Sequence, residues 1–383
     1  MSNDATHIRI MFVISSLDRG GSETHLVDMV NTLDHSCFQP SICVLHSAPL
    51  ISEVRKDVLV HANLAIWAGD LRVLPRLVRL FRTQAPMIVD TLGRDDGALW
   101  GRLAARLAGV PVIIESLHHG YFSATKDPKN AIYHVLNHFL DPYTDAFVTV
   151  SRSQRAFFAK IGLPEDRTTV IYNGIEVGRF NPDNAVCTAA RQKLDLPLET
   201  PVIGMVANLV PVKRHDLLLK ALMKVRERVP DVKCLLIGDG VLRATLEGMV
   251  QQMGLSETVV FLGSRPDVAG LLPALDVFVL SSDSESFSMA IVEAMASGKP
   301  VIATNSGGPG EIVIEGETGF LVPIGQPSSL AEKITLLLQN PTLAHQMGQK
   351  ARCRAVNCFS LERMISAREM LFSDLLEREG LAQ

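Results

Sequence analysis

The sequence predicts an α/β protein made of two Rossmann-like, doubly wound domains, because strand-like and helical segments alternate along most of the chain. At 383 residues the chain is longer than a single compact core usually supports, so two domains are expected. The alternation is interrupted once, by the polar stretch 178–184, and then restarts. Alternating strands and helices are typical of parallel sheets. We therefore expect domains at 1–178 and 179–360, joined by a linker at 178–184.

Apolar runs of strand length define the elements of both domains. In the first half they are 8–14, 41–45, 87–92, 110–115, 146–151 and 169–172, mostly with helical patterns between them. In the second half they are 202–206, 233–238, 259–263, 277–280 and 301–304, and from residue 328 on the chain reads as helical. Ligands of such sheets bind at the carboxyl ends of the strands, so polar residues that follow a strand are candidate site residues.

Composition excludes several classes of protein. A net charge of −4 argues against nucleic acid as the main partner. The six cysteines form no Cys-x-x-Cys pair, which predicts reduced thiols and no zinc site. No apolar run approaches the ~20 residues of a membrane span, and the polar start of the chain does not resemble a signal peptide. We expect a cytoplasmic protein.

The most informative stretch is 281–300, which lies between two strand-like runs. A helix is expected to begin near Ser288, which puts Glu285 in the loop before it and Glu293 inside it, about one and a half turns on. The free amides of a first helical turn bind phosphate. Carboxylates on either side of such an anion site suggest that the ligand also carries hydroxyl groups. A phosphate with hydroxyls indicates a sugar nucleotide.

This stretch resembles the signature of retaining glycosyltransferases of family four, which have the GT-B fold. The resemblance rests on Glu-x7-Glu followed by Ala-Met-Ala-x-Gly-x-Pro-Val, and it covers nearly the whole chain. Further motifs in the family's order are Gly20-Gly21-Ser22-Glu23, Val150-Ser151, Tyr172-Asn173-Gly174-Ile175, Lys213-Arg214-His215-Asp216, Leu236-Ile237-Gly238-Asp239-Gly240 and Gly307-Gly308-Pro309-Gly310-Glu311. In this family the last helix, here 361–383, commonly crosses back to the first domain.

The resemblance implies that Lys213 places a positive charge on the diphosphate as it leaves. An exposed lysine at a helix start is the alternative. Many family members have an arginine five positions earlier, where this chain has Asn208, and Arg214 replaces the usual glycine. Asn208 can donate a hydrogen bond but carries no charge. Two alternatives follow: the diphosphate is neutralised less completely in this chain, or Arg214 or Arg265 supplies the missing charge.

The resemblance also assigns the two glutamates. Glu293 should accept hydrogen bonds from the ribose, Glu285 should contact the transferred sugar, and the amides of Phe287, Ser288 and Met289 should meet the sugar or the phosphate. Solvated acids at the start of a helix would look similar, because negative charge suits that position.

The candidate site residues of the first domain follow the ends of its strand-like runs. The turn at Gly20 and Gly21 can pass close to a phosphate, although an ordinary strand-to-helix turn would look the same. A histidine after the fourth run is expected near the reacting sugar by resemblance, and His118 is favoured over His119. Asp95 and Asp96 could line the acceptor pocket or could cap a helix.

Taken together, these residues and the resemblance indicate a transferase that moves a sugar from a nucleoside-diphosphate sugar, in particular a UDP-sugar, to a glycan, lipid-linked or small-molecule acceptor. Retention of configuration is what the resemblance implies. No metal or other cofactor is expected. The alternatives are a nucleotide-sugar epimerase of the same fold and a non-catalytic sugar-nucleotide-binding protein. Exchange at C2 without an acceptor would indicate the epimerase, and binding without turnover would indicate the binding protein.

The segment 71–86 raises a separate hypothesis of peripheral membrane contact. It carries Arg72, Arg76, Arg79 and Arg82 among apolar residues. Such a helix could rest its arginines on anionic headgroups. The alternative is a helix that packs its apolar face on the sheet and leaves its arginines in water.

Overall fold

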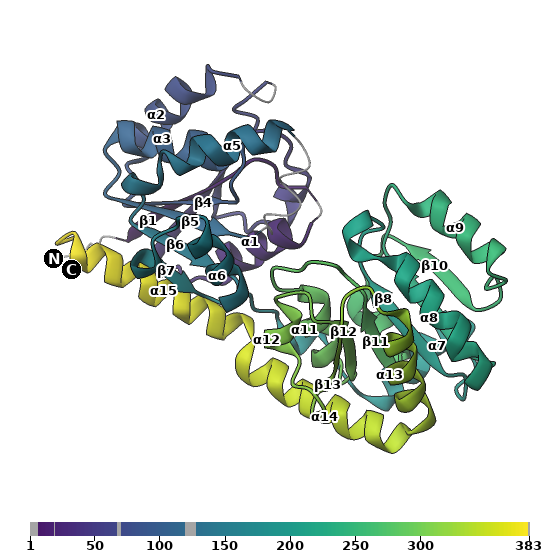
Figure 1. Cartoon of the computed structure of the whole chain (residues 1–383). Helices are drawn as coiled ribbons and strands as arrows, with labels where there is room; N and C mark the ends of the chain where they lie inside the picture. Colours follow the sequence, from purple (N-terminus) through teal and green to yellow (C-terminus); the bar gives the residue numbers. More distant parts are fainter. Residues whose placement is uncertain (1–6, 19, 67–69, 119–127, 382–383) are drawn as a thin grey trace. The chain divides into compact units, whose positions relative to one another are not determined.

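The protein forms two compact units, each built on one parallel sheet (Figure 1). A computed structural model describes residues 7–18, 20–66, 70–118 and 128–381. Unit 1 holds residues 1–174 together with 361–383, and unit 2 holds residues 175–360. The expected α/β, doubly wound fold class is confirmed.

The sheet of unit 1 has seven strands in the order β3-β2-β1-β4-β5-β6-β7. The strands are β1 (Ile8–Ile14), β2 (Phe38–Val44), β3 (Leu59–His61), β4 (Ile88–Leu92), β5 (Val112–Leu117), β6 (Ala146–Thr149) and β7 (Thr168–Val170). The helices are α1 (Gly21–Thr32), α2 (Val73–Gln84), α3 (Asp96–Ala108), α5 (Pro128–His138), α6 (Arg152–Lys160) and α15 (Leu361–Arg378).

The side chains of the central strand β1 pack into two cores, one on each face of the sheet. Successive side chains of a strand point to opposite faces of the sheet. Phe12 therefore joins the core formed with α1 and α15, whereas Val13 joins the core formed with α2 and α3. On the first face, Phe372 of α15 packs edge-on against Phe12 and Phe38, with ring centroids 6.4 and 6.1 Å apart. The last helix is thus part of the core of unit 1.

A buried ion pair also ties α15 to the sheet. Arg368 of α15 donates to Asp90 of β4 at 3.1 Å and to Ser116 of β5 at 2.7 Å. All three side chains are buried. Because removing one partner of a buried pair leaves an uncompensated charge, this contact constrains where α15 can lie.

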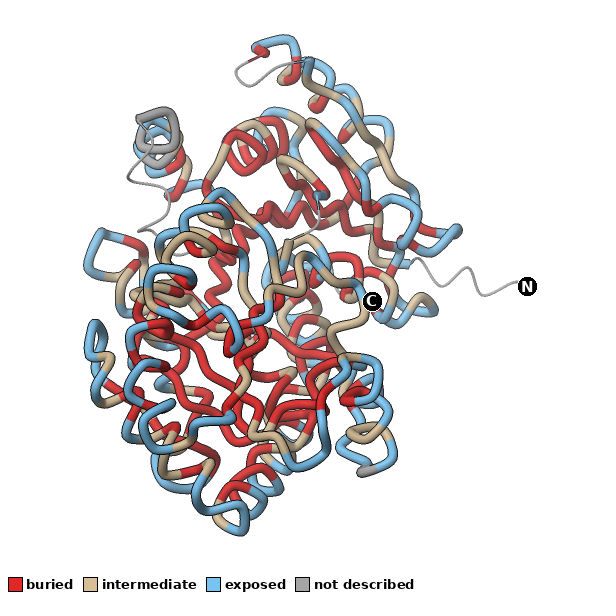
Figure 2. The backbone as a smooth tube through the Cα atoms, turned by 90° about the vertical axis from the view of Figure 1, so that its right-hand side faces the viewer, coloured by how far each residue is buried: buried red, intermediate tan, exposed pale blue. Residues whose placement is uncertain are grey.

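The sheet of unit 2 has six strands in the order β10-β9-β8-β11-β12-β13. They are β8 (Val202–Val206), β9 (Lys233–Ile237), β10 (Val259–Gly263), β11 (Val277–Leu280), β12 (Val301–Thr304) and β13 (Gly319–Val322). The main helices are α7 (Asn184–Lys193), α8 (His215–Arg228), α9 (Arg243–Gln252), α11 (Met289–Ala296), α13 (Pro327–Gln339) and α14 (Pro341–Cys358), and a short 3-10 turn, η5 (Pro211–Lys213), precedes α8. The strands β8, β11 and β12 are almost wholly buried. Along the backbone, buried segments lie inside and exposed segments lie at the outside (Figure 2).

The structure differs from the sequence analysis at the expected linker. The units divide between residues 174 and 175, and the stretch 178–184 belongs to unit 2. Phe180 is buried there, its carbonyl accepts a hydrogen bond from Arg352 at 2.7 Å, and Asp183 caps α7. Because most residues of this stretch are polar, the burial of its one aromatic side chain was not expected from the sequence.

Two strands, β3 and β13, were not expected from the sequence. β3 has three residues and its first, Leu59, is exposed, so it forms no buried apolar run. Other strands begin at another residue than expected, and β2 is one of them, since it begins at Phe38 and not at residue 41. The run expected at 110–115 begins instead at Val112, because Gly109 ends α3 in a left-handed conformation and a loop follows. As a result His118 follows directly after β5.

Candidate functional site

The loop between β11 and α11 is fastened to the start of α8. Ser281, the first residue after β11, donates its hydroxyl to the carbonyl oxygens of Lys213 at 3.0 Å and of Arg214 at 2.9 Å. The amide of Asp283 donates to the carbonyl of Val212 at 2.8 Å. Two segments that are far apart in the sequence are therefore brought side by side just beyond the carboxyl ends of β8 and β11, where a ligand of such a sheet is expected.

Lys213 and Glu285 meet at this point. Lys213 Nζ donates to Glu285 Oε1 at 2.6 Å, and Ser282 Oγ donates to the same oxygen at 2.6 Å. The lysine side chain is 24% exposed and the glutamate side chain 9% exposed. An ammonium group has three N–H donors, so its contact with Glu285 leaves donors that can reach an anion from the open side.

The backbone of Glu285, like its side chain, is fixed by hydrogen bonds. Its amide donates to the carbonyl of Ser306 at 2.9 Å, and its carbonyl accepts from the amide of Gly308 at 2.9 Å. A Cβ at Gly308 would lie 2.5 Å from Phe287 Cα, so only glycine permits this approach. The glycine motif at 307–310 therefore supports the loop that carries Glu285.

Phe287 serves the core with its side chain. It is buried, and its ring packs edge-on against Phe359 with the centroids 5.6 Å apart. The sequence analysis expected the backbone amide of Phe287 to meet the donor, and the buried side chain takes no part in that prediction.

Ser288 has an unusual backbone conformation. It precedes α11 with φ 112° and ψ 94°, a region that side-chain-bearing residues rarely occupy, and its hydroxyl does not cap the helix. Met289 is the first residue of the helix, and Glu293 lies half-buried one turn further on. The structure thus brings Lys213, Glu285, Ser288 and Met289 into one neighbourhood, with Glu293 on the helix behind them.

The other predicted cations are already engaged with carboxylates. Arg214 donates to Asp216 and to Asp283, both at 2.9 Å, and the carboxylates of Asp216 and Asp283 raise the pKa of this guanidinium. Arg265 donates to Asp267 at 2.7 Å. Among the predicted cations, Lys213 is the one in contact with Glu285.

Asn208 is exposed in the loop after β8. That loop is approached closely by another, since a Cβ at Gly238 would lie 2.0 Å from the carbonyl oxygen of Ala207. Asn208 therefore lies at the correct edge of the sheet, but it carries no charge.

The glycine turn of unit 1 leads into α1. A Cβ at Gly20 would lie 2.3 Å from Glu23 Oε2, so glycine at this position makes room for the carboxyl group of Glu23. Ser22 donates to the same oxygen at 2.8 Å. Gly21 has open space around the position of its missing side chain. The sequence analysis singled out the glycines but not Glu23, whose carboxyl group occupies the turn.

His118 is buried at the end of β5 and lies against a second histidine. The rings of His118 and His25 of α1 have centroids 5.3 Å apart. Burial, and to a lesser extent the charge of Arg368, lowers the pKa of His25 to about 3, so His25 is neutral at physiological pH. His119, the alternative candidate, lies outside the described residues. The sequence analysis missed His25, although its position five residues after Gly20 was a signal.

Asp95 and Asp96 have different partners. Asp95 Oδ1 accepts from the amides of Gly97 at 3.0 Å and Ala98 at 3.3 Å, and so caps α3. Asp96 accepts from Ser15 at 2.5 Å and from His46 at 2.8 Å. Burial and the adjacent charge of Asp96 raise the pKa of Asp95 to about 7.

Within the described residues, no three His, Cys, Asp or Glu side chains gather as metal ligands. None of the helices in this part of the chain is sufficiently long and apolar to cross a bilayer.

Comparison with known proteins defines the class of this fold and site. The profile "Glycosyltransferase Family 4" matches residues 19–179, and the profile "Glycosyl transferases group 1" matches residues 187–354. A solved structure of Anabaena HepE in complex with UDP and glucose superposes with a TM-score of 0.84 at 22% identity, covering 96% of this chain and 100% of that one. The fold is that of the GT-B glycosyltransferases.

Two curated relatives extend the comparison. The GDP-mannose-dependent α-(1-6)-phosphatidylinositol monomannoside mannosyltransferase of Mycolicibacterium smegmatis is 32% identical over 67% of this chain and 68% of its own length. The UDP-Gal:α-D-GlcNAc-diphosphoundecaprenol α-1,3-galactosyltransferase of Escherichia coli is 28% identical over 80% of both chains. The chain belongs to glycosyltransferase family 4, the glycosyl transferases of group 1, and is a glycosyltransferase.

Proposed function

We propose that this glycosyltransferase moves a sugar from a UDP-sugar to the hydroxyl group of a glycan, lipid-linked or small-molecule acceptor, with retention of configuration and without a metal ion. The observation that carries the proposal is the contact between Lys213 and Glu285 in front of α11. In a member of this family, that contact brings a cation and a hydrogen-bond acceptor to the helix end that suits a phosphate.

Each of the two charged groups takes one part of the donor. Lys213 directs its remaining N–H donors at the diphosphate, whose negative charge grows as the bond to the sugar breaks. The first amides of α11 add to this stabilisation. Glu285, held by Lys213 and Ser282, presents its carboxylate to the hydroxyl groups of the sugar. Glu293 accepts from the ribose hydroxyls.

Retention follows from departure and attack on the same face of the sugar. Glu285 accepts two hydrogen bonds on Oε1, which reduces its ability to attack carbon, and Asp283 is paired with Arg214. With both carboxylates of this loop engaged, we assign neither as a covalent nucleophile. The departing phosphate oxygen takes the proton of the acceptor hydroxyl, so the C–O bond to the phosphate breaks as the new glycosidic bond forms.

The choice of UDP has support from two proteins. The HepE structure contains UDP, and the E. coli relative is named for UDP-Gal. The M. smegmatis relative is named for GDP-mannose, so the nucleotide is the part of the proposal that a binding assay tests first.

Calorimetry with UDP, GDP and ADP, followed by their sugar conjugates, tests the donor. We expect UDP to bind more tightly than GDP or ADP, and a UDP-sugar to be hydrolysed slowly with release of UDP in the presence of EDTA. NMR of the first product should show the anomer of the donor. Binding without turnover would favour the sugar-nucleotide-binding protein, and exchange at C2 without an acceptor would favour the epimerase.

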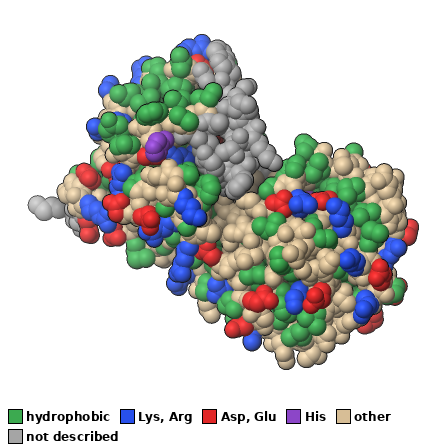
Figure 3. All heavy atoms as spheres, in the orientation of Figure 1, with side chains coloured by type: hydrophobic (Ala, Val, Ile, Leu, Met, Phe, Trp, Pro, Cys, Tyr) green, Lys and Arg blue, Asp and Glu red, His purple; other side chains and the backbone are tan. Residues whose placement is uncertain are grey.

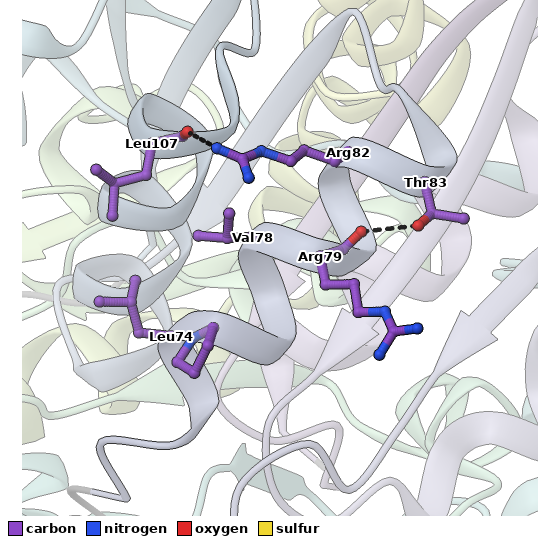
Figure 4. Close-up of a pocket in the computed structure, with 7 residues that line it drawn as sticks. Leu74, Val78, Arg79, Arg82, Thr83 and Leu107 are labelled. Carbon is purple, nitrogen blue, oxygen red and sulfur yellow. Dashed lines mark hydrogen bonds between the residues drawn. The ribbon is translucent and has the colours of Figure 1, made fainter.

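We further propose that the outer side of α2 contacts an anionic lipid surface. Val73, Leu77 and Phe81 of α2 are buried in unit 1, as the alternative from the sequence analysis expected. A groove of about 580 Å³ nevertheless remains outside, with Leu74 and Val78 of α2 facing Leu107 of α3 (Figure 4). Hydrophobic side chains gather on this face of unit 1, with basic side chains beside them (Figure 3).

The four arginines of α2 and its N-terminal flank are not equivalent. Arg72 donates to Asp70 at 2.8 Å, and Arg76 lies 3.7 Å from the same buried carboxylate, so Asp70 offsets part of their charge. Arg82 donates to the carbonyl oxygen of Leu107 at 3.1 Å, which leaves its charge uncompensated, and Arg79 extends away from Leu107 (Figure 4). Arg79 and Arg82 are therefore the arginines that would contribute ~1 kcal/mol each at an anionic surface.

Vesicle co-sedimentation tests this contact. Vesicles that contain phosphatidylglycerol should retain the protein, and phosphatidylcholine vesicles should retain less. Arg79→Gln with Arg82→Gln should weaken binding about tenfold or more. The control, Arg226→Gln with Arg228→Gln at the end of α8, removes the same charge from unit 2. Equal binding by all three proteins would refute the proposal.

A further inference from the structure

A cavity in unit 2 lies at the amino-terminal ends of the strands, whereas the candidate donor site lies beyond their carboxyl ends. Its walls include the residues that precede three strands, with Pro201 before β8, Asp276 before β11 and Pro300 before β12. The end of α13 and the start of α14 complete the walls. The volume is about 330 Å³, within the range of roughly 300–1,000 Å³ that is usual for small-molecule sites.

A buried arginine fixes one wall of this cavity. Arg191 of α7 donates to the carbonyl oxygen of Thr200 at 2.9 Å, next to β8, and to that of Ala274 at 3.1 Å, near β11. The same guanidinium holds both carboxylate oxygens of Asp276, each at 2.9 Å. This side of the cavity is therefore preformed, and the charges of Arg191 and Asp276 compensate each other.

Lys299 brings a second positive charge to the lining. It is half-buried, and its Nζ donates to the carbonyl oxygen of Pro273 at 2.8 Å. Burial lowers the pKa of Lys299, because it removes water from the charged form. Asp276, whose charge also acts on Lys299, is already held by Arg191. An ammonium group has three N–H donors, so the contact with Pro273 leaves donors with which Lys299 can bind an anion. Such an anion would supply the pairing that a buried charge requires.

The other lining residues restrict which anion fits. Leu275 and the two leucines at the end of α13, Leu337 and Leu338, add apolar surface, which suits a ligand with an apolar body. Glu199 also lines the cavity and is exposed. The negative charges of Glu199 and Asp276 oppose a doubly charged phosphate more strongly than a singly charged carboxylate. The lining is therefore suited to one carboxylate attached to a small apolar group.

We propose that this cavity binds a small monocarboxylic acid, with its carboxylate on Lys299 and its apolar part on Leu337 and Leu338. The two ends of the unit 2 strands then serve two classes of ligand, a nucleotide sugar at the carboxyl ends and an organic acid at the amino ends. The site does not depend on the proposed transfer reaction, because none of its lining residues belongs to the candidate donor site.

A fluorinated probe tests the proposal with the full chain. The compound para-fluorophenylacetate joins one carboxylate to an apolar ring, and fluorine NMR measures its binding directly. We expect phenylacetate to displace this reporter. Phenylacetamide, which has the same shape without the charge, and acetate, which lacks the ring, should each bind about tenfold more weakly or worse. Equal binding of phenylacetate and phenylacetamide would overturn the proposal, and so would a reporter that does not bind.

A pair of lysine variants locates the reporter. Lys299→Met removes the ammonium, keeps much of the length of the side chain, and should weaken reporter binding by about tenfold or more. The control is Lys233→Met, because Lys233 also donates to a backbone carbonyl, that of Glu257, and is not among the lining residues. It should bind the reporter as the parent does. Unchanged binding by Lys299→Met would contradict the proposal. Thermal unfolding verifies that both variants fold, and the comparison of the two phenyl compounds on the parent protein needs neither variant.

Competition with UDP separates this cavity from the candidate donor site, where Lys213 is also able to bind an anion. UDP at saturating concentration should leave the reporter bound, since the two ligands occupy opposite ends of the strands. Displacement of the reporter by UDP would assign it to the donor site and overturn the proposal. If the protein binds the reporter but no nucleotide, the proposed function is wrong and the acid site stands.

Discussion

The candidate residues of unit 2 and of unit 1 differ in how their charges are compensated. In unit 2, Lys213 pairs with Glu285 and Arg214 with Asp283, and the basic side chains are 24% and 29% exposed. In unit 1, His25 and His118 are buried against each other, and Asp95 accepts hydrogen bonds from the amides of Gly97 and Ala98. Partly exposed pairs can exchange partners when a ligand arrives, whereas burial disfavours the charged form of Asp95. The first arrangement suits a charged donor.

The largest effect is expected for Lys213, which belongs to the paired charges of unit 2. Lys213→Ala should lower turnover by about 10²–10³-fold, the usual cost of losing one preorganised donor to a developing negative charge. Steady-state release of UDP measures it. Lys220→Ala, on the exposed side of α8, is the matched control. Full turnover by Lys213→Ala would mean that Arg214 or Arg265 serves the diphosphate.

Binding of the bare nucleotide separates the two glutamates of unit 2. Glu293→Ala should weaken UDP binding by about 1.5–3 kcal/mol, because the ribose loses a charged hydrogen-bond acceptor. Glu285→Ala should bind bare UDP nearly as well as the parent, because its partner is the sugar. Calorimetry with UDP measures both. If Glu293→Ala binds UDP with unchanged affinity, the ribose assignment is incorrect.

The pH dependence of stability tests the buried carboxyl group of Asp95 in unit 1. The pKa of Asp95 is about 7 in the folded protein and 3.8 in the absence of burial, so folding favours its protonated form. The cost of burying the charge is therefore absent near pH 4, grows as the pH rises and is complete above pH 7. Asp95→Asn should raise the free energy of unfolding by about 2 kcal/mol at pH 8 and by little at pH 4. Thermal unfolding at the two pH values measures the difference, and an equal effect at both would contradict it.

The smallest effect, a change in stability, is expected for substitutions of Ser288. Its positive φ costs about 1 kcal/mol or more in any residue except glycine. Ser288→Gly should therefore stabilise the protein by about 1 kcal/mol, whereas Ser288→Ala, which keeps the strained backbone and removes only the hydroxyl, should not. A melting temperature that is the same for both variants would show that this backbone is not strained.

The two candidate sites also differed in how far the sequence could predict them. Glu285, Ser288, Met289 and Glu293 lie in one continuous stretch, so their spacing was visible before the fold was known. The residues that line a small cavity in unit 1, among them Ser15, Asp95 and His118, come from the ends of β1, β4 and β5 and from α1, and no short motif connects them. Asp95 could be read as a cap or as a pocket residue, and the structure assigns it both positions.

Other features depend on packing and could not be predicted from local composition. Ser282 shares Oε1 of Glu285 with Lys213, but a serine after a strand is too common to indicate such a role. The boundary between the units was expected at 178 and lies at 174, because Phe180 is buried in unit 2 within an otherwise polar stretch. The overall fold was predictable because the alternation of apolar runs persists over the whole chain.

The position of α15 has a consequence for synthesis on the ribosome. Unit 2 is one continuous segment, so all of its residues are available once the chain has emerged to residue 360. Unit 1 is not complete at that stage, because Phe372, Leu375 and Leu376 of α15 fill one face of its core and Arg368 neutralises the buried Asp90. The core of unit 1 therefore cannot be completed until α15 has been translated, whereas all residues of unit 2 are available earlier.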